Sequence, residues 1–290
     1  MIRIGIVGAE NSHAAAVAKT LNEAKKVPGF KVTAIWGETD EFAANTAQAG
    51  GIPVIVKKPA DLIALADAIL ICHRHAKYHL PAAQAFLKAR LPMFIDKPFC
   101  YRLAEGRRFL AEAARRKVPV TSHSALPHQQ AFAGFRAHLA KAGAVLAAAS
   151  FGPCDLDSVY GGIFFYGVHQ VEMIVDAFGQ DVSAVAVARK QGAKDAVASL
   201  FYHSGLTVSM HCLSGHAAGF QLAAITEKGP VAAKIDYDAD TYLTGVREFC
   251  KMFRTGRQPH DTKRLLAPVA ILEAMEKAAR TGKVEKVAKL

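Results

Sequence analysis

The sequence lacks several features that would place it in an easily recognised class of protein. Its five cysteines stand singly and in an odd number, without a CxxC pair, so no disulfide scaffold is indicated. No apolar run approaches the roughly 20 residues of a membrane span. The chain enters an apolar segment directly, without a basic region and an apolar leader, so we expect a cytoplasmic protein that does not bind a membrane.

The composition is that of a packed globular protein. With 290 residues, 51% hydrophobic and 21% charged, the chain is long enough for two domains. Basic residues outnumber acidic ones by 36 to 25, a formal net charge of +11. They occur as short pairs, such as Lys25-Lys26 and Arg107-Arg108, and form no recognisable nucleic-acid module. We therefore interpret them as solvated faces with some attraction for anionic ligands, and expect no nucleic-acid partner.

The first part of the chain alternates β-branched runs with alanine-rich segments of helical character. This alternation is typical of an α/β domain in which helices cover both faces of a parallel sheet. The predicted strands are Ile2–Val7, Val32–Trp36, Ile52–Ile55, Ala68–Cys72, Pro92–Ile95 and Val118–Ser122. The predicted helices are Ala14–Lys26, Phe42–Ala49, Leu62–Ala66, His79–Arg90 and Leu103–Lys117. Together they predict a doubly wound, Rossmann-type domain over residues 1–122.

After Pro127 the pattern changes to longer strands joined by turns. His203-Ser204-Gly205 and Lys228-Gly229-Pro230 have the composition of hairpin turns. The predicted elements are helices Gln129–Ala142, Val168–Phe178 and Leu265–Arg280, which Gly282 ends, and strands such as Leu206–Met210 and Gln221–Thr226. We expect residues 123–290 to form an α+β domain with a large, mainly antiparallel sheet, whose C-terminal helix can pack back on the first domain.

The turn after the first strand has the position of a dinucleotide-binding loop. The expected spacing is Gly-x-Gly-x-x-Gly, which places backbone N–H groups at a pyrophosphate. Here Gly8 keeps its place, whereas Glu10 and His13 occupy the other two glycine positions. We expect Glu10 to point away in the first helical turn, with Asn11 or Ser12 as the N-cap. His13 either donates to a phosphate oxygen or packs against the sheet.

Glu38 follows the second predicted strand, where an acidic residue of such domains accepts hydrogen bonds from the adenine ribose. It comes one position late, after Trp36 and Gly37. No arginine follows within residues 37–41 to hold a 2′-phosphate, which weakly favours NAD over NADP. The alternative is a solvated turn carboxylate.

The segment from Cys72 to His79 follows the fourth predicted strand and holds His73, Arg74 and His75 as well. We expect it to be a polar rim for the nicotinamide or for an anionic group of the substrate. Zinc is the alternative, here or at His211, Cys212 and His216. Neither spacing matches a closed structural zinc site, so we expect no metal.

Lys97 and His169 are the candidate catalytic residues. Lys97 stands at the end of a strand between Asp96 and Pro98, where it can polarise a substrate oxygen or move a proton. The alternative is an Asp-Lys surface pair. His169 begins a predicted helix and suits proton exchange with a hydroxyl group. Glu172, one turn later, either orients His169, binds a substrate hydroxyl or is a plain helix carboxylate, and Tyr166 is a further polar candidate.

Five landmarks in this order resemble the Gfo/Idh/MocA oxidoreductases: the opening strand and turn, His79, Asp96-Lys97-Pro98, Gly167-Val168-His169 and the C-terminal helix. The chain departs from the family pattern at several positions. Asp96 replaces a glutamate, Arg74 a proline, and Phe165 the aspartate four residues before His169.

The resemblance implies an oxidoreductase that uses NAD or NADP on a sugar, polyol or related hydroxy compound. It also implies a cis Lys97–Pro98 bond and a homodimer or homotetramer. The alternative is a homologue that keeps the fold and binds or regulates without redox catalysis. The residues expected at the cofactor are Gly8, Ala9, Glu10, Asn11, Ser12, His13, Trp36, Glu38, Cys72, His73, Arg74, His79, Asp96, Lys97 and Pro98. Those expected at the substrate are Lys97, Tyr166, His169 and Glu172, while His123, His128 and Tyr160 are left unplaced.

Overall fold

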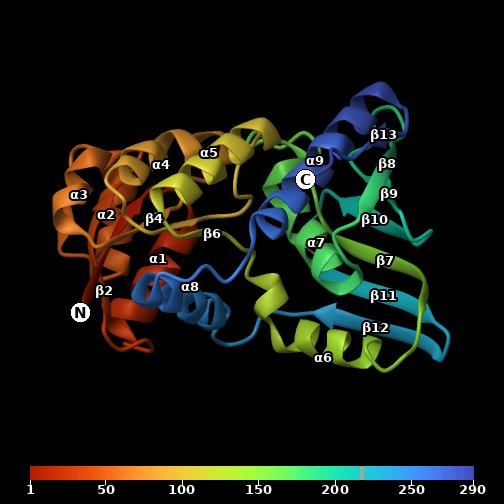
Figure 1. Ribbon diagram of the computed structural model, residues 1–290, viewed down its shortest axis with the longest axis horizontal. Coiled ribbons are helices and arrows are strands. Elements are labelled where there is room, and N and C mark those ends of the chain that lie inside the picture. The colour runs from red at the N-terminus through yellow and green to blue at the C-terminus, as the bar shows by residue number, and fades with distance from the viewer. Residues whose placement is uncertain (216–218) are drawn as a thin grey trace. The chain divides into compact units, whose positions relative to one another are not determined.

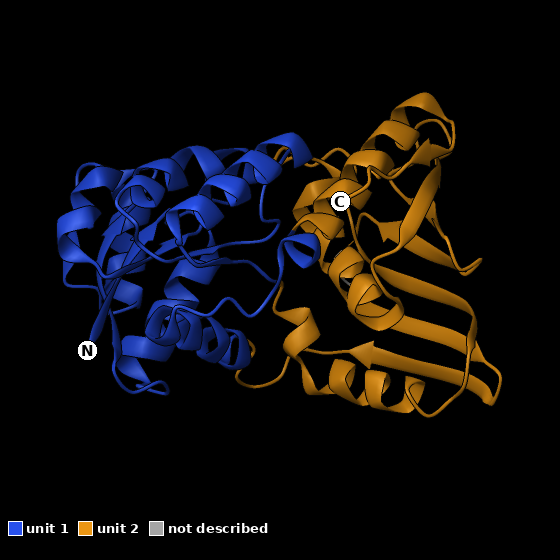
Figure 2. Cartoon of the chain, in the orientation of Figure 1, with its two compact units in different colours: residues 1–123, 242–265 blue, residues 124–241, 266–290 orange. Residues whose placement is uncertain are grey.

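A computed structural model describes residues 1–215 and 219–290. The chain forms two compact units (Figure 2). Unit 1 consists of residues Met1–His123 and Tyr242–Leu265, and unit 2 of residues Ser124–Thr241 and Leu266–Leu290. The segment 242–265, which the sequence assigned to the second domain, therefore belongs to the first unit.

Unit 1 contains a parallel sheet of six strands (Figure 1). Their order across the sheet is β3 (Val54–Ile55), β2 (Phe30–Trp36), β1 (Ile2–Val7), β4 (Ala68–Ile71), β5 (Met93–Ile95) and β6 (Val120–Thr121). The doubly wound topology predicted from the sequence is confirmed. The strand order reverses between β1 and β4, and loops at the carboxyl ends of such a strand pair form the usual ligand crevice.

The helices of unit 1 lie near the predicted positions, except that the first differs and that α8 is not among the predicted helices. They are α1 (Ser12–Ala18), α2 (Asp40–Ala49), α3 (Leu62–Leu65), α4 (His79–Lys88), α5 (Leu103–Arg116) and α8 (Leu243–Thr255), with short 3₁₀ turns at Pro59–Asp61 and Ala76–Tyr78. The helix predicted over Ala14–Lys26 instead starts at Ser12 and changes into a π-helical turn, Lys19–Glu23. It starts earlier because Asn11 serves as its N-cap.

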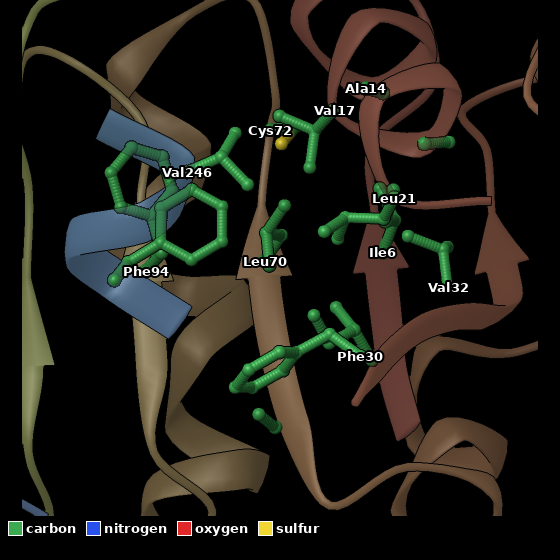
Figure 3. Close-up of a cluster of buried hydrophobic side chains, with 14 of the residues drawn as sticks. Ile6, Ala14, Val17, Leu21, Phe30, Val32, Leu70, Cys72, Phe94 and Val246 are labelled. Carbon is green, nitrogen blue, oxygen red and sulfur yellow. The ribbon is translucent and has the colours of Figure 1, made fainter. Parts of the chain in front are cut away.

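The core of unit 1 depends on α8 (Figure 3). Ile4, Ile6 and Leu70 turn toward a cluster that also contains Val17 and Leu21. To this cluster α8 adds Val246, Phe249, Cys250, Met252 and Phe253. The rings of Phe94 and Phe249 lie 4.8 Å apart. Burial of each large apolar side chain contributes about 1.5–3 kcal/mol to the free energy of unfolding. Helix α8 therefore stabilises unit 1.

Unit 2 is built on a sheet of seven strands. Their order is β12 (Gly229–Ile235), β11 (Phe220–Thr226), β7 (Val145–Pro153), β10 (Thr207–Leu213), β9 (Ala196–Tyr202), β8 (Val182–Ala188) and β13 (Glu285–Lys286). Neighbours pair antiparallel except β7 and β10, which are parallel. The predicted mainly antiparallel sheet is thus confirmed. The remaining helices are α6 (Gln130–Leu139), α7 (Ile163–Phe178) and α9 (Thr262–Thr281), with a 3₁₀ turn at Leu126–His128.

Helix α7 begins five residues before the predicted start at Val168. The cause is the glycine pair before it, since Gly161 and Gly162 both have positive φ angles, +106° and +59°. A Cβ atom on Gly162 would also lie 2.7 Å from the carbonyl oxygen of Leu156. The loop therefore closes tightly on the glycines, the helix starts directly after them, and His169 lies in its second turn instead of at its beginning.

The cysteines are all buried, and none forms a disulfide, as the sequence predicts. Among the residues that the structure describes, no helix is both long and apolar enough to cross a membrane.

Candidate functional site

The loops that follow β1 and β4 touch each other at Gly8. This glycine has a φ angle of +103°, and a Cβ atom there would lie 2.7 Å from the backbone nitrogen of His73 and 2.8 Å from the carbonyl carbon of Cys72. Because neither backbone atom can move aside easily, the position requires glycine. The one glycine of the fingerprint that the sequence keeps is the one at the point where the strand order reverses.

Glu38 caps the loop after β1. Its Oε2 atom accepts hydrogen bonds from the backbone N–H groups of Ala9, at 2.7 Å, and Glu10, at 3.0 Å. Its Oε1 atom is buried and has no hydrogen-bond partner within the described part of the chain. The interpretation of Glu38 as a solvated turn carboxylate is therefore wrong. One oxygen holds the loop, and the other is a buried acceptor that a hydroxyl group could satisfy.

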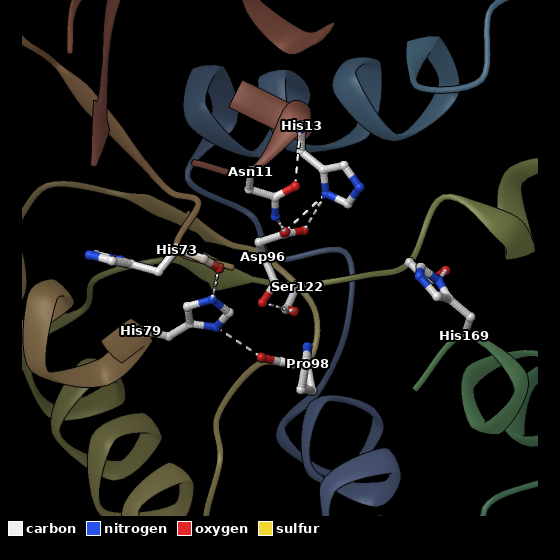
Figure 4. A network of polar contacts seen from close by, with 9 residues as sticks. Asn11, His13, His73, His79, Asp96, Pro98, Ser122 and His169 are labelled. Atoms are coloured by element: carbon white, nitrogen blue, oxygen red, sulfur yellow. Dashed lines mark hydrogen bonds and ion pairs between the residues drawn. The ribbon is translucent and has the colours of Figure 1, made fainter. Parts of the chain in front are cut away.

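The start of α1 is held by Asp96 (Figure 4). Asn11 accepts the backbone N–H of His13 with its side-chain oxygen and donates its Nδ2 group to Asp96 at 2.7 Å. The Nδ1 atom of His13 lies 2.9 Å from the same carboxylate, and its ring lies 5.2 Å from that of Tyr242. Since Asn11 is the N-cap, Glu10 precedes the helix, and the expectation that it belongs to the first turn is wrong.

Asp96 is a buried anion with several partners. Burial raises the pKa of its carboxyl group, but the charge and hydrogen bond of His13, with the charges of Lys97 and His79, outweigh it and hold the pKa below its ordinary value. Lys97, the next residue, is only 7% exposed, so it is not part of a surface pair. The Lys97–Pro98 peptide bond is cis.

His79 connects the loops after β4 and β5 (Figure 4). Its Nδ1 atom lies 2.9 Å from the carbonyl oxygen of Pro98, and its Nε2 atom 2.8 Å from that of His73. The residue is fully buried, and burial is the main cause that lowers its pKa. The His79 side chain thus links the backbone of the loops after β4 and β5.

The His73 ring lies between two other aromatic rings. Its centroid is 5.9 Å from that of Trp36 and 5.8 Å from that of Tyr78. Burial, and then the charge of His79, lowers the pKa of His73 to about 4. Arg74, which follows it, is partly exposed, whereas Cys72 is buried. A neutral ring beside Trp36 is therefore available at neutral pH.

In unit 2, His169 is hydrogen-bonded to a residue that the sequence reading did not select. Its Nδ1 atom lies 2.6 Å from the Oγ atom of Ser124, and both residues are buried. The backbone N–H of Ser124 donates to Glu172 at 2.9 Å. The only sequence signal was that Ser124 closely follows a predicted strand, where loops of α/β sheets carry functional groups. No residue pattern marks a single serine there.

Aromatic rings surround His169 on its own helix and on β11. Phe165 stands where the resembled family has aspartate, and its ring lies 4.9 Å from Tyr160 and 4.9 Å from Tyr166. The rings of Tyr166 and Phe220 lie 5.5 and 5.7 Å from the His169 ring. With phenylalanine at position 165, the carboxylate linked to His169 comes from Glu172, three residues later on α7. Ser124 connects the two residues, since its hydroxyl contacts His169 and its backbone N–H donates to Glu172.

The structure sorts the predicted site residues between the units. The contact network of unit 1 contains Gly8, Ala9, Glu10, Asn11, His13, Trp36, Glu38, Cys72, His73, His79, Asp96 and Pro98, with Ser12 starting α1 and Lys97 following Asp96. Unit 2 contains Tyr166, His169 and Glu172. Of the unplaced candidates, His123 lies in unit 1 with its Nδ1 atom 3.3 Å from Glu248, and Tyr160 and His128 belong to unit 2. His216, weighed as a zinc ligand, lies outside the described residues.

Comparison with known proteins agrees with this architecture. Residues 2–124 match a family profile described as "Oxidoreductase family, NAD-binding Rossmann fold". No curated protein sequence gives a significant match to the chain.

Solved structures similar to the whole chain include three with low sequence identity. GenD2 from gentamicin A biosynthesis, solved in complex with NAD, has 17% identity over 99% of this chain and 97% of its own, with a TM-score of 0.86. The myo-inositol 2-dehydrogenase from Lactobacillus plantarum has 16% identity over 99% of both chains and a TM-score of 0.86. The myo-inositol dehydrogenase from Lactobacillus casei, in complex with NAD(H) and myo-inositol, has 12% identity over 100% of this chain and 98% of its own, with a TM-score of 0.84. At these identities the likeness establishes the fold.

Proposed function

We propose that this protein is an NAD-dependent oxidoreductase of a polyol, sugar or related hydroxy compound, because residues 2–124 match the Gfo/Idh/MocA oxidoreductase profile. The observation that carries the proposal is the buried Oε1 atom of Glu38, an acceptor without a partner among the described residues at the carboxyl end of β2. The choice of a polyol is supported by the substrates named for the inositol dehydrogenases of the same fold. Fold alone does not fix a substrate.

The residues around the crevice fit a dinucleotide. Gly8 lets the loops after β1 and β4 lie in contact where a dinucleotide is expected, and Glu38 offers an acceptor to the ribose hydroxyls. The negative charge of Glu38 would repel a 2′-phosphate, which favours NAD over NADP. Bound NAD would accept or return a hydride at its nicotinamide ring. His73 and Trp36 would offer ring faces, and the loop from Gly8 to His13 would meet the phosphates.

Two residues of this chain are the proposed catalytic residues. Lys97 is buried beside the Asp96 carboxylate, and a lysine in such a place can polarise an oxygen atom or transfer a proton to it. His169 is hydrogen-bonded to Ser124 and would contact the same class of substrate oxygen with its other ring nitrogen. Tyr166 and Glu172 would contact the remaining substrate hydroxyls.

The cofactor is tested with Trp36, the only tryptophan of the chain, which lies next to His73. NAD and NADP are titrated against its fluorescence and by calorimetry. Saturable binding of NAD at micromolar to millimolar concentration, tighter than that of NADP, is the expected result. Failure of both to bind would favour the alternative of a homologue without redox catalysis.

Catalysis is tested with a panel of inositols, sugars and hydroxy acids, followed by NADH absorbance. We expect turnover of at least one member, and its loss in Lys97→Ala and in His169→Ala, with NAD binding retained in His169→Ala. Full turnover in both variants would show that the assigned roles are wrong. We also propose a cytoplasmic homodimer or homotetramer, which light scattering on the purified protein tests for subunit number.

A further inference from the structure

We propose that Ser124 is a positioning residue for His169, whose hydroxyl donates a hydrogen bond to Nδ1 and keeps the neutral imidazole in the tautomer that carries its proton on Nε2. The inference concerns which atom of His169 carries the proton. It rests on the proposed function only for what that proton does to a substrate.

Ser124 forms hydrogen bonds to two residues of α7, one through its hydroxyl and one through its backbone N–H. The Oγ atom lies 2.6 Å from Nδ1 of His169, and the backbone N–H donates to Oε2 of Glu172 at 2.9 Å. Ser124 is 0% exposed, His169 5% and Glu172 3%. Since residues three apart on a helix share one face, the serine lies across a single turn of α7. Water cannot replace these contacts while the residues stay buried.

The direction of the Ser124–His169 hydrogen bond follows from counting donors and acceptors. The Oγ atom already accepts the backbone N–H of Leu126 at 3.2 Å. Among the described residues, the only acceptor within reach of the hydroxyl hydrogen is Nδ1 of His169. If Nδ1 carried the proton instead, Oγ would accept twice and its hydrogen would be buried without a partner, which folded proteins rarely tolerate. Nδ1 is therefore the acceptor.

This tautomer determines what His169 offers a substrate under the proposed function. A neutral imidazole with its proton on Nε2 donates a hydrogen bond to a substrate oxygen and cannot accept a proton at that atom. In carbonyl reduction a reduced nicotinamide cofactor would give a hydride to the substrate carbon and become oxidised, the electron pair of the C=O double bond would move to oxygen, and that oxygen would take a proton. The Nε2–H group of His169 would then stabilise the developing negative charge, and the proton would come from a group other than this atom. A carboxylate partner, which can only accept, would select the opposite tautomer.

The tautomer is measured by ¹⁵N NMR of the full-length protein labelled at histidine, at about pH 8.5, where histidines of ordinary pKa are neutral. The His169 signals are identified by their loss in His169→Gln. We expect the Nδ1 resonance of an unprotonated nitrogen and the Nε2 resonance of a protonated one. In Ser124→Ala we expect both to shift toward averaged values, and Ser124→Thr, which keeps the hydroxyl, to restore the separation.

Ser150→Ala is the matched control. Ser150 is also fully buried and donates its hydroxyl to the next residue of α7, Gln170, at 2.8 Å. It should leave the His169 spectrum unchanged. A protonated Nδ1 in the unaltered protein, or the same spectrum in Ser124→Ala, would overturn the proposal.

The measurement needs no substrate, so it stays decisive if the proposed function fails. Should Ser124→Ala not fold, the spectrum of the unaltered protein still decides the tautomer. If a substrate is found, Ser124→Ala should shift the pH profile of kcat and change KM little. Ser150→Ala should change neither.

Discussion

The carboxylate of Glu38 accepts the backbone N–H of Ala9 at 2.7 Å. These residues follow β2 and β1, so the contact closes the turn that a dinucleotide would meet. It also explains how a loop with Glu10 in place of glycine is stabilised, because an acceptor from a neighbouring strand satisfies N–H groups that a phosphate would otherwise satisfy.

Glu38→Gln should weaken NAD binding by about tenfold, since the amide is a weaker acceptor for a ribose hydroxyl than the carboxylate. The preference for NAD over NADP should also shrink, because the charge that repels a 2′-phosphate is gone. Trp36 fluorescence titrations give both affinities. Glu41→Gln, an exposed position in the first turn of α2, is the control and should change neither. Unchanged NAD affinity in Glu38→Gln would remove Glu38 from the cofactor site.

Asp96→Asn should lower the free energy of unfolding by about 1–3 kcal/mol at pH 7, because the amide lacks the negative charge that strengthens the hydrogen bonds from Asn11 and His13. The pKa of Asp96 is held below its ordinary value, so its contribution is complete above about pH 4 and is lost as the pH falls further. Urea denaturation measures the free energy of unfolding of both proteins at pH 7 and pH 3. The difference between Asp96→Asn and the unaltered protein should be smaller at pH 3.

Asp40→Asn is the control for Asp96→Asn. Asp40 forms an exposed ion pair with Lys57 at 3.5 Å, and such pairs contribute at most about 1 kcal/mol. A stability loss as large as that of Asp96→Asn would show that the measurement reports charge in general and not the buried network.

His73 should make the fold sensitive to acid. Burial lowers the pKa of His73 to about 4, so the folded protein favours the neutral ring. The free energy of unfolding is therefore highest above about pH 6.5 and falls by up to about 3 kcal/mol as the pH is lowered toward 4. His73→Phe should flatten the decline, since it cannot be protonated and Nδ1 of His73 has no hydrogen-bond partner to lose among the described residues. His203→Gln, in the exposed turn after β9, should leave the decline as it is. Equal slopes in the unaltered protein and His73→Phe would contradict the assignment.

Gly8→Ala should destabilise unit 1 by several kcal/mol and abolish NAD binding. The new Cβ would clash with backbone atoms of Cys72 and His73 in addition to the strain of a positive φ angle. Gly256→Ala separates the two effects, because Gly256 has a φ angle of +70° but open space around it, and should cost only about 1 kcal/mol. Thermal unfolding of both variants makes the comparison, and similar losses would show that the contact with His73 is unimportant.

The sequence predicts the fold of unit 1 well because its strands are short apolar runs with clear ends. The predicted bounds of β1 agree with the structure, and those of β2 and β4 differ only at one end. The start of α7 was missed because its first residues, Ile163 to Tyr166, read as an apolar run without helical periodicity. The start of α7 is set by the backbone conformation of Gly161 and Gly162, which the periodicity of apolar residues does not indicate.

Site residues could be predicted where their position after a strand indicates their role. They could not be predicted where the role depends on contacts between residues far apart in the sequence. Glu38 was found because it follows a strand, but its hydrogen bonds to the loop after β1 were not. Ser124 was missed because it meets His169 45 residues later in the chain, through a contact that folding alone creates. The burial of Lys97 was likewise invisible in a segment that reads equally well as a surface turn.

The position of α8 bears on the order of events during synthesis. The strands of unit 1 are complete by residue 121, but Phe249 and its neighbours on α8 reach the core only when the chain has been extended past residue 255. While the ribosome adds the intervening residues, the apolar surface around Phe94 and Leu70 has no cover, and such surface is where nascent chains aggregate or recruit chaperones. A stop codon after residue 123 would therefore yield an aggregation-prone fragment instead of a free nucleotide-binding domain, and a fragment meant to fold alone has to carry α8 with it.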